Sequence, residues 1–189
     1  MNTGRSNPLA SILERMASYG ANRFYAKILA ANDNSKNQIY LGSGFGALNI
    51  VPHGSIETDS SITAGSIRDR AKAQVEFYWL EPQGLNAAPN AQLILYPKYP
   101  EVRMSGFLKG ANTSHKELMT SREEGRVLIL GICPDDRVIG YVVSHNSPGA
   151  IALNEQFDQL PTEGVFSDLS SFSPTQQDSK SKLLIQLRR

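Results

Sequence analysis

The sequence predicts a mainly β fold, a barrel or sandwich, with two or three short helices. Runs of alternating apolar and polar residues recur between positions 23 and 143, and clusters of turn residues separate them. Apolar residues at helical spacing are confined to a few short stretches, and the strand–helix alternation of a parallel sheet is missing. At 189 residues and 40% hydrophobic content, the chain is long enough for one domain with a sizeable core.

The first half of the chain begins with a helix. Leu9, Ile12, Leu13 and Met16 have helical spacing, so residues 8–19 are predicted to be helical, and Gly20 is a suitable stop. Alternating or short apolar runs then predict strands over residues 23–30, 38–41 and 48–51. Residues 53–66 are rich in Ser, Thr and Gly, which predicts a long loop.

The second half contains the stronger strand patterns. Alternation predicts a strand over 73–80, with Val75, Phe77 and Trp79 facing one way, and a turn-rich connection over 82–90. The remaining expected elements are strands 92–96 and 101–108, a helix over 114–124 with Ser114 and Glu117 as its capping box, a hairpin formed by 127–133 and 138–143, and a short helical stretch near Glu155.

Composition restricts the possible partners and compartment. The formal net charge is +1, so a nucleic-acid site would have to be a local patch. The only cysteine, Cys133, cannot form an internal disulfide, which indicates a reducing, cytoplasmic environment. No apolar stretch is long enough to span a membrane. Residues 161–182 are rich in Ser, Gln and Asp, so we expect a domain over 1–160 and a linker over 161–189 toward an absent catalytic domain.

Motifs for catalysis and for cofactors are not found. The glycines between positions 42 and 46 lack phosphate-binding spacing, and the three histidines are scattered without zinc-ligand spacing. A magnesium-dependent nuclease needs clustered carboxylates. Glu101-Val102-Arg103 imitates a Glu-x-Lys signature, but an arginine cannot lose its proton and act as a base. We therefore predict no catalytic residue, no metal site and no cofactor in this domain.

The stretch around Arg103 has the chemistry to read DNA. In an extended strand, Glu101, Arg103 and Ser105 share one face. Arginine can donate two hydrogen bonds to guanine, and glutamate can accept one from the cytosine amino group. An alternative is a surface ion pair beside a turn. The polar run 32–37 also carries side chains that bind bases or phosphates, although an ordinary hairpin-like loop explains it equally well.

Two blocks of the chain resemble a known family. Residues 25–41 begin with Tyr25-Ala26-Lys27-Ile28-Leu29-Ala30-Ala31-Asn32-Asp33, which is similar to the Lys-x-Leu-x-Ala-Asn-Asp pattern of the N-terminal effector domain of the EcoRII restriction endonuclease. Residues 93–110, with Glu101-Val102-Arg103, resemble the later Glu-x-Arg strand of that domain. Related domains precede catalytic domains of the MvaI and BcnI type, as in UbaLAI.

This resemblance implies a DNA-binding pseudobarrel like the plant B-three domains, which grips the major groove with two arms. Carried over by position, residues 27–38 form the N-terminal arm and residues 98–109 the C-terminal arm, with a CCWGG-type target. The implied DNA-binding residues are Lys27, Asn32, Asp33, Asn34, Ser35, Lys36, Asn37, Gln38, Lys98, Tyr99, Glu101, Arg103, Ser105 and Lys109. The run 34–37 is shorter and less glycine-rich than in EcoRII.

The sequence thus predicts a site-specific double-stranded DNA-binding domain, itself non-catalytic, of a type II restriction endonuclease. Magnesium would be needed only by an attached nuclease domain. One alternative is a self-contained metal-dependent DNA endonuclease, which a cleavage assay would identify. Another is a protein-interaction barrel, which would show no salt-dependent binding to DNA.

Overall fold

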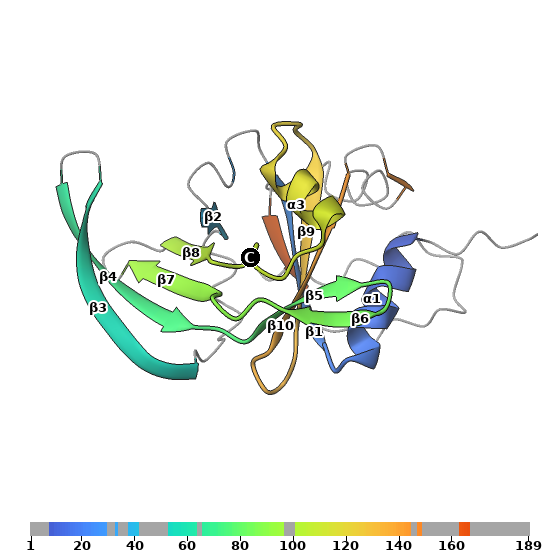
Figure 1. Cartoon of the computed structure of the whole chain (residues 1–189), viewed down its shortest axis with the longest axis horizontal. Helices are drawn as coiled ribbons and strands as arrows, with labels where there is room; N and C mark the ends of the chain where they lie inside the picture. The colour runs from blue at the N-terminus through green and yellow to red at the C-terminus, as the bar shows by residue number, and fades with distance from the viewer. Residues whose placement is uncertain are drawn as a thin grey trace, which may run out of the picture.

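The fold is mainly β, as the sequence predicts. The computed structural model describes residues 8–29, 33, 38–41, 53–63, 66–96, 101–144, 147–148 and 163–166. Within this part of the chain, strands form a six-stranded and a five-stranded sheet, accompanied by two short α-helices. Hydrogen bonds between the described strands do not join the sheets into a closed barrel. Figure 1 shows the two sheets side by side, with a long hairpin projecting at one end.

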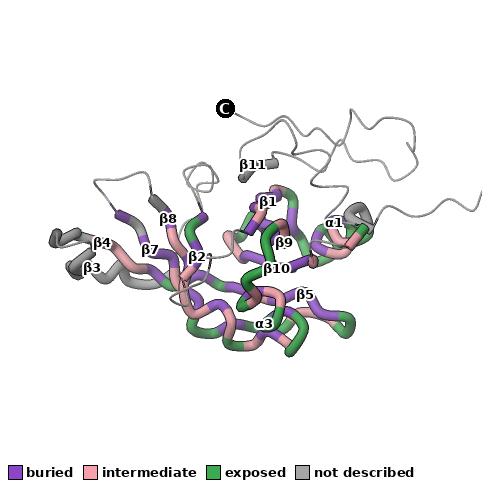
Figure 2. Tube along the Cα trace, turned by 90° about the horizontal axis from the view of Figure 1, so that it is seen from above, coloured by how far each residue is buried: buried purple, intermediate pink, exposed green. Residues whose placement is uncertain are grey.

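The first sheet has the strand order β11-β1-β9-β10-β5-β6. Its pairs are antiparallel except β10 and β5, which run parallel. The strands are β1 Arg23–Leu29, β5 Phe77–Glu81, β6 Gly84–Ala87, β9 Arg126–Ile132, β10 Val138–Val143 and β11 Glu163–Phe166. Every residue of β9 is buried, and Figure 2 shows the buried positions concentrated where β1, β9 and β10 lie together. The central strands β1, β9 and β10 are therefore covered on both faces, whereas the edge strand β6 has no buried residue.

The second sheet is antiparallel throughout, with the order β2-β8-β7-β4-β3. Its strands are β2 Gln38–Tyr40, β3 His53–Thr63, β4 Ser66–Gln74, β7 Gln92–Tyr96 and β8 Glu101–Ser105. The β3–β4 pairing continues to Thr63 and Ser66, whereas β4 pairs with β7 only over Ala71–Gln74. The outer part of this hairpin therefore extends past the rest of the sheet (Figure 1).

The core lies between the two sheets. It combines Leu128 and Trp79 of the first sheet with Leu93 and Met104 of the second. Trp79 donates a hydrogen bond from Nε1 to the carbonyl oxygen of Phe107 at 2.6 Å, so its buried polar atom is satisfied. Aromatic ring contacts join Trp79, Phe77 and Phe107 at centroid distances of 5.2 to 6.4 Å.

The two helices cover different parts of the sheets. Helix α1, Pro8–Ser18, places Leu13 and Met16 in a second apolar cluster against the far face of the first sheet. Helix α3, Thr113–Thr120, is capped by Asn112, whose side chain accepts the backbone N–H of His115 at 2.7 Å. The prediction of Ser114 as the cap is wrong because Asn112, two residues earlier, already has the extended backbone of a cap residue.

The strand predicted over 101–108 ends at Ser105, and the helix predicted over 114–124 is Thr113–Thr120. Three further predicted elements also differ from the structure. The loop expected over 53–66 is wrong: His53–Thr63 form β3 and Ser66 begins β4, although this part of the chain is rich in Ser and Thr. The expected strand 73–80 is divided between the sheets, since β4 ends at Gln74 and β5 begins at Phe77. The alternation nevertheless continues through the crossover, because Val75, Phe77 and Trp79 are all buried. The connection 82–90 also contains β6.

The later part of the chain adds one edge strand. β11 lies beyond position 160, in the segment expected to be a linker, and pairs with β1 from Phe24 to Lys27. The six-stranded sheet therefore includes residues from beyond the expected boundary. The predicted strand 48–51 and the helical stretch near Glu155 lie outside the described residues. Among the described residues, no helix is both long and apolar enough to cross a membrane.

Candidate nucleic-acid interface

Strand β8 presents polar side chains on the face turned away from the core. Val102 and Met104 are buried, with exposures of 7% and 0%. Arg103, which lies between them, and Ser105, which follows Met104, are half-buried. This alternation follows from the pleat of the strand. Glu101 begins the strand and is described by its backbone alone. The structure thus brings Arg103 and Ser105 to one surface, as their spacing predicts.

Neighbouring strands add side chains to this surface in register. Ser105 pairs with Gln38 of β2 and with Gln92 of β7, and Gln92 pairs with Gln74 of β4. One row of polar groups therefore crosses four strands. The next row runs through Tyr40, Arg103, Ile94 and Lys72. We define the outer face as these two rows together with Tyr96; within it Ile94 and Tyr96 are buried, at 1% and 5% exposed.

Arg103 is held against an aromatic ring on the outer face. Its guanidinium carbon lies 5.6 Å from the centroid of Tyr96, a side chain that is only 5% exposed. A cation at this distance from the face of an aromatic ring is attracted by the ring, and the contact limits where the guanidinium can lie. Beside Arg103, Tyr40 is the most exposed of the described large apolar side chains, at 42%.

Lys27 and Asp33 do not lie on the outer face. Lys27 belongs to β1, and its side chain points between the sheets with the residue only 6% exposed. Its Nζ atom is 3.0 Å from Oδ1 of Asp33 and donates to the carbonyl oxygen of Tyr40 at 2.6 Å. The same Nζ lies 5.2 Å from the centroid of the Tyr40 ring. These two residues, both predicted to contact DNA, form an ion pair whose side chains are only 7% and 11% exposed.

Arg126 is a buried cation near this pair that the sequence did not reveal. It is completely buried at the start of β9 and donates to the carbonyl oxygens of Leu118 and Glu123. Burial lowers the pKa of Arg126, and the negative charges of Asp33 and Glu123 oppose that shift. Asp33 is therefore close enough to both Lys27 and Arg126 to stabilise two positive charges.

Lys109 is exposed on the turn that follows β8. That turn is fixed to the β5–β6 region, since Nδ2 of Asn86 donates to the carbonyl oxygen of Gly110 at 2.6 Å. An exposed lysine on an anchored turn suits a phosphate contact. The other predicted DNA-binding residues lie outside the described part of the chain: Asn32, Asn34, Ser35, Lys36, Asn37, Lys98 and Tyr99.

The side chain of His115 on α3 is a second buried polar group that was not predicted from the sequence. His115 is 4% exposed, stacks on Trp79 at 4.9 Å between centroids and meets the ring of Tyr141 at 5.0 Å. Its Nδ1 atom has no hydrogen-bond partner among the described residues. Burial lowers the pKa of His115, and the charge of Glu81 acts against this shift. Among the described residues, no three His, Cys, Asp or Glu side chains are grouped so as to hold a metal ion.

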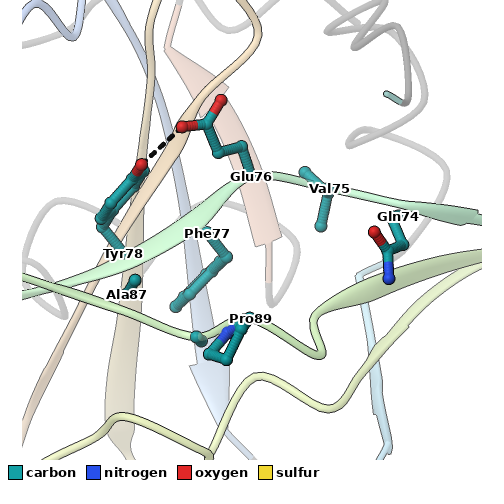
Figure 3. A pocket seen from close by; sticks show the side chains of 8 residues that line it. Gln74, Val75, Glu76, Phe77, Tyr78, Ala87 and Pro89 are labelled. Carbon is teal, nitrogen blue, oxygen red and sulfur yellow. Dashed lines mark hydrogen bonds between the residues drawn. The ribbon is translucent and has the colours of Figure 1, made fainter. Parts of the chain in front are cut away.

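A shallow pocket lies where the chain crosses from β4 to β5 (Figure 3). Phe77 and Pro89 line it, and at its rim the hydroxyl of Tyr78 donates to Oε1 of Glu76 at 2.5 Å. This carboxylate raises the pKa of Tyr78 because the hydrogen bond favours the protonated phenol. The pocket volume of about 200 Å³ is below the range of most small-molecule sites. The outer face is therefore the stronger candidate.

Comparison with protein-family models and with curated protein sequences finds no match to this chain.

Proposed function

We propose that this chain is a sequence-specific double-stranded DNA-binding domain of the EcoRII effector type, with a pseudobarrel fold and a CCWGG-type target. In this proposal the domain belongs to a cytoplasmic type II restriction endonuclease and directs an attached nuclease domain that needs magnesium. Two sheets that share one core without closing are compatible with an incomplete barrel. The resemblance in residues 25–41 and 93–110 supplies the family assignment.

The observation that carries the proposal is the setting of Arg103. The guanidinium of Arg103 lies over the ring of Tyr96. Arg103 is paired with Tyr40 on one neighbouring strand and with Ile94 on the other. The adjacent row of the outer face contains Gln38, Ser105 and Gln92. Arginine reads guanine through two hydrogen bonds, and glutamine reads adenine in the same way. Such groups at fixed spacing on neighbouring strands provide direct readout of base edges. A strand pair can enter the major groove of B-DNA.

The proposal divides the predicted residues by role. Arg103 and Gln38 read bases, and Glu101 accepts from a cytosine amino group. Ser105, Lys36, Lys98 and Lys109 contact phosphate and fix the register of the protein on the duplex. The remaining arm residues, Asn32, Asn34, Ser35, Asn37 and Tyr99, complete the groove contacts.

The test is a binding titration with two duplexes of equal length and composition, one with a central CCWGG site and one with that site shuffled. We expect the intact site to bind about 1,000-fold more tightly or better, and both affinities to fall steeply with salt. Equal affinity for the two duplexes would refute sequence-specific binding.

A parallel incubation with magnesium separates this proposal from a self-contained nuclease. The expected result is that both duplexes remain intact. If DNA cleavage persists after the protein has been purified a second time, the nuclease activity belongs to this chain. Binding that does not depend on salt, or no binding, would favour a protein-interaction domain.

A further inference from the structure

The ion pair between Lys27 and Asp33 is an unusual feature for a surface arm. Its side chains are only 7% and 11% exposed, and Nζ to Oδ1 is 3.0 Å. Removing two charges from water is costly, and good geometry with additional hydrogen bonds is needed to compensate. The carbonyl oxygen of Tyr40 provides such a bond at 2.6 Å. We call Lys27, Asp33 and Tyr40 the Lys27 latch.

The latch joins three separate points of the chain. Lys27 lies in β1, Tyr40 ends β2, and Asp33 lies in the connection between these strands. A neighbouring contact strengthens the arrangement, because the buried hydroxyl of Tyr25 donates to the carbonyl oxygen of Leu41. Two side chains of β1, on the same face, therefore hold two consecutive carbonyl groups at the end of β2. These contacts connect Lys27 and Asp33 of the predicted N-terminal arm with the end of β2, just beyond that arm.

The latch also reaches the second arm. Tyr40 pairs with Arg103 across β2 and β8, and the backbone N–H of Leu41 donates to the carbonyl oxygen of Val102 at 2.8 Å. Asp33, Lys27, Tyr40 and Arg103 consequently form a continuous series of contacts and paired positions from one arm to the other. A change at Lys27 would be transmitted to the strand that carries Arg103.

We infer that Lys27 and Asp33 are positioning residues that set the spacing between the two DNA-binding arms, and that neither contacts DNA. This inference rests on the proposed DNA-binding function. Lys27 would have to give up its contacts with Asp33 and with the carbonyl oxygen of Tyr40 before it could reach a phosphate, and losing these largely buried contacts is unfavourable. The arrangement instead pre-organises the arms, so that less ordering is required when DNA binds.

The inference is tested with variants of the full chain. Lys27→Met removes the buried positive charge, and Lys27→Met/Asp33→Asn removes both charges of the ion pair together. Lys109→Met is the contrast, because it removes an exposed lysine assigned to a phosphate. Lys116→Met, which removes an exposed lysine on α3, is the inert control. The measurements are affinity for CCWGG and shuffled duplexes over a range of salt, and the rate of trypsin cleavage after Lys36 without DNA.

For both Lys27 variants we expect affinity for the CCWGG duplex to fall roughly tenfold. Their salt slope should match the wild type, whereas Lys109→Met should lower the slope by about one unit. Cleavage after Lys36 should accelerate in the Lys27 variants and remain unchanged in Lys116→Met. If Lys27→Met folds poorly, the changes in affinity and in the rate of cleavage after Lys36 can still be measured in Lys27→Met/Asp33→Asn.

A salt slope that falls by about one unit in Lys27→Met would make Lys27 a phosphate contact and overturn the inference. Unchanged cleavage after Lys36 together with unchanged affinity would also overturn it. If the wild-type chain fails to distinguish the two duplexes, the proposed function fails instead. The cleavage rates then decide separately whether the latch holds the connection between β1 and β2.

Discussion

At the level of single residues, Arg103 carries the proposed specificity. It lies over the ring of Tyr96 in the outer face, and in the proposal its guanidinium makes a two-bond contact with guanine. We expect Arg103→Ala to reduce the affinity ratio between the CCWGG duplex and a single-base variant by roughly 5- to 150-fold, which corresponds to about 1–3 kcal/mol. Competition titrations with the two duplexes measure this ratio.

Arg103→Lys is the matched control for charge. Lysine keeps the positive charge but cannot make the planar pair of hydrogen bonds, so this variant should retain general affinity and still lose discrimination. An unchanged ratio in Arg103→Ala, with both affinities reduced equally, would mean that Arg103 contacts a phosphate.

His115 should make stability depend on pH. Its folded-state pKa lies below the ordinary value of 6.5 because the imidazole is buried, so the folded protein binds a proton less readily than the unfolded chain. The stabilisation from neutral His115 is therefore complete above about pH 6.5 and is lost as pH falls toward the lower folded pKa. Urea unfolding at pH 7.5, 6.5 and 5.5 measures the loss.

The groups around His115 do not remove this dependence. Trp79 and Tyr141 surround the ring, and the carboxylate of Glu81 already accepts the N–H of Asn112 at 3.0 Å. In His115→Gln, the free energy of unfolding should fall less between pH 7.5 and 5.5 than in the wild type. Parallel curves for the two proteins would exclude His115 as the cause.

At the level of elements, Gly106 determines where β8 ends. Its φ of +71° favours glycine, and a Cβ there would lie 1.9 Å from the carbonyl oxygen of Asn90. The strand predicted to reach residue 108 stops at Ser105 because the chain turns sharply against the β6–β7 connection. Gly106→Ala should destabilise the protein by about 2 kcal/mol or more in urea unfolding, through backbone strain and the clash.

Gly20→Ala provides the control for backbone strain alone. Gly20 has a φ of +102°, but an added Cβ would meet only side-chain atoms at 3.5 Å and beyond. Its cost should therefore be smaller than that of Gly106→Ala. A larger loss in Gly20→Ala would show that the close approach to Asn90 relaxes easily.

The arms should bind the DNA backbone through their lysines. Lys36 and Lys109 lie in the predicted N-terminal and C-terminal arms, and phosphate contacts position a protein without specifying sequence. Lys36→Ala and Lys109→Ala should weaken binding to CCWGG and shuffled duplexes about equally and reduce the salt slope by about one unit each. Unchanged affinity and slope in both variants would place the lysines away from DNA and weaken the two-arm proposal.

The elements that could be predicted from sequence have large apolar side chains at regular spacing. β1, β7 and the β9–β10 hairpin belong to this group, as does α1. β3 could not be predicted because its stability comes from pairing with β4 rather than from apolar alternation. The end of β4 and the start of β5, on either side of residues 75 and 76, could not be predicted either. The alternation of buried residues continues through this crossover even though the chain passes from one sheet to the other.

At the level of the whole molecule, the site depends on how the two sheets are joined. The spacing placed Arg103 and Ser105 on one strand face, and the resemblance supplied Gln38, but Gln92 and Gln74 join the same row only through cross-strand register. The sequence likewise could not indicate that Lys27 turns inward, because an exposed and a buried lysine look alike until the facing sheet is present. Tertiary packing thus separates the proposed contact residues from the positioning residues.

The central claim is that this fold recognises a particular DNA sequence. The most direct measurement is selection of bound duplexes from a pool with a randomised central segment, followed by sequencing of the retained DNA. The account predicts enrichment of a short CCWGG-type site, and loss of that enrichment when the selection is repeated with Arg103→Ala. Retained duplexes with the same base composition as the starting pool would contradict it.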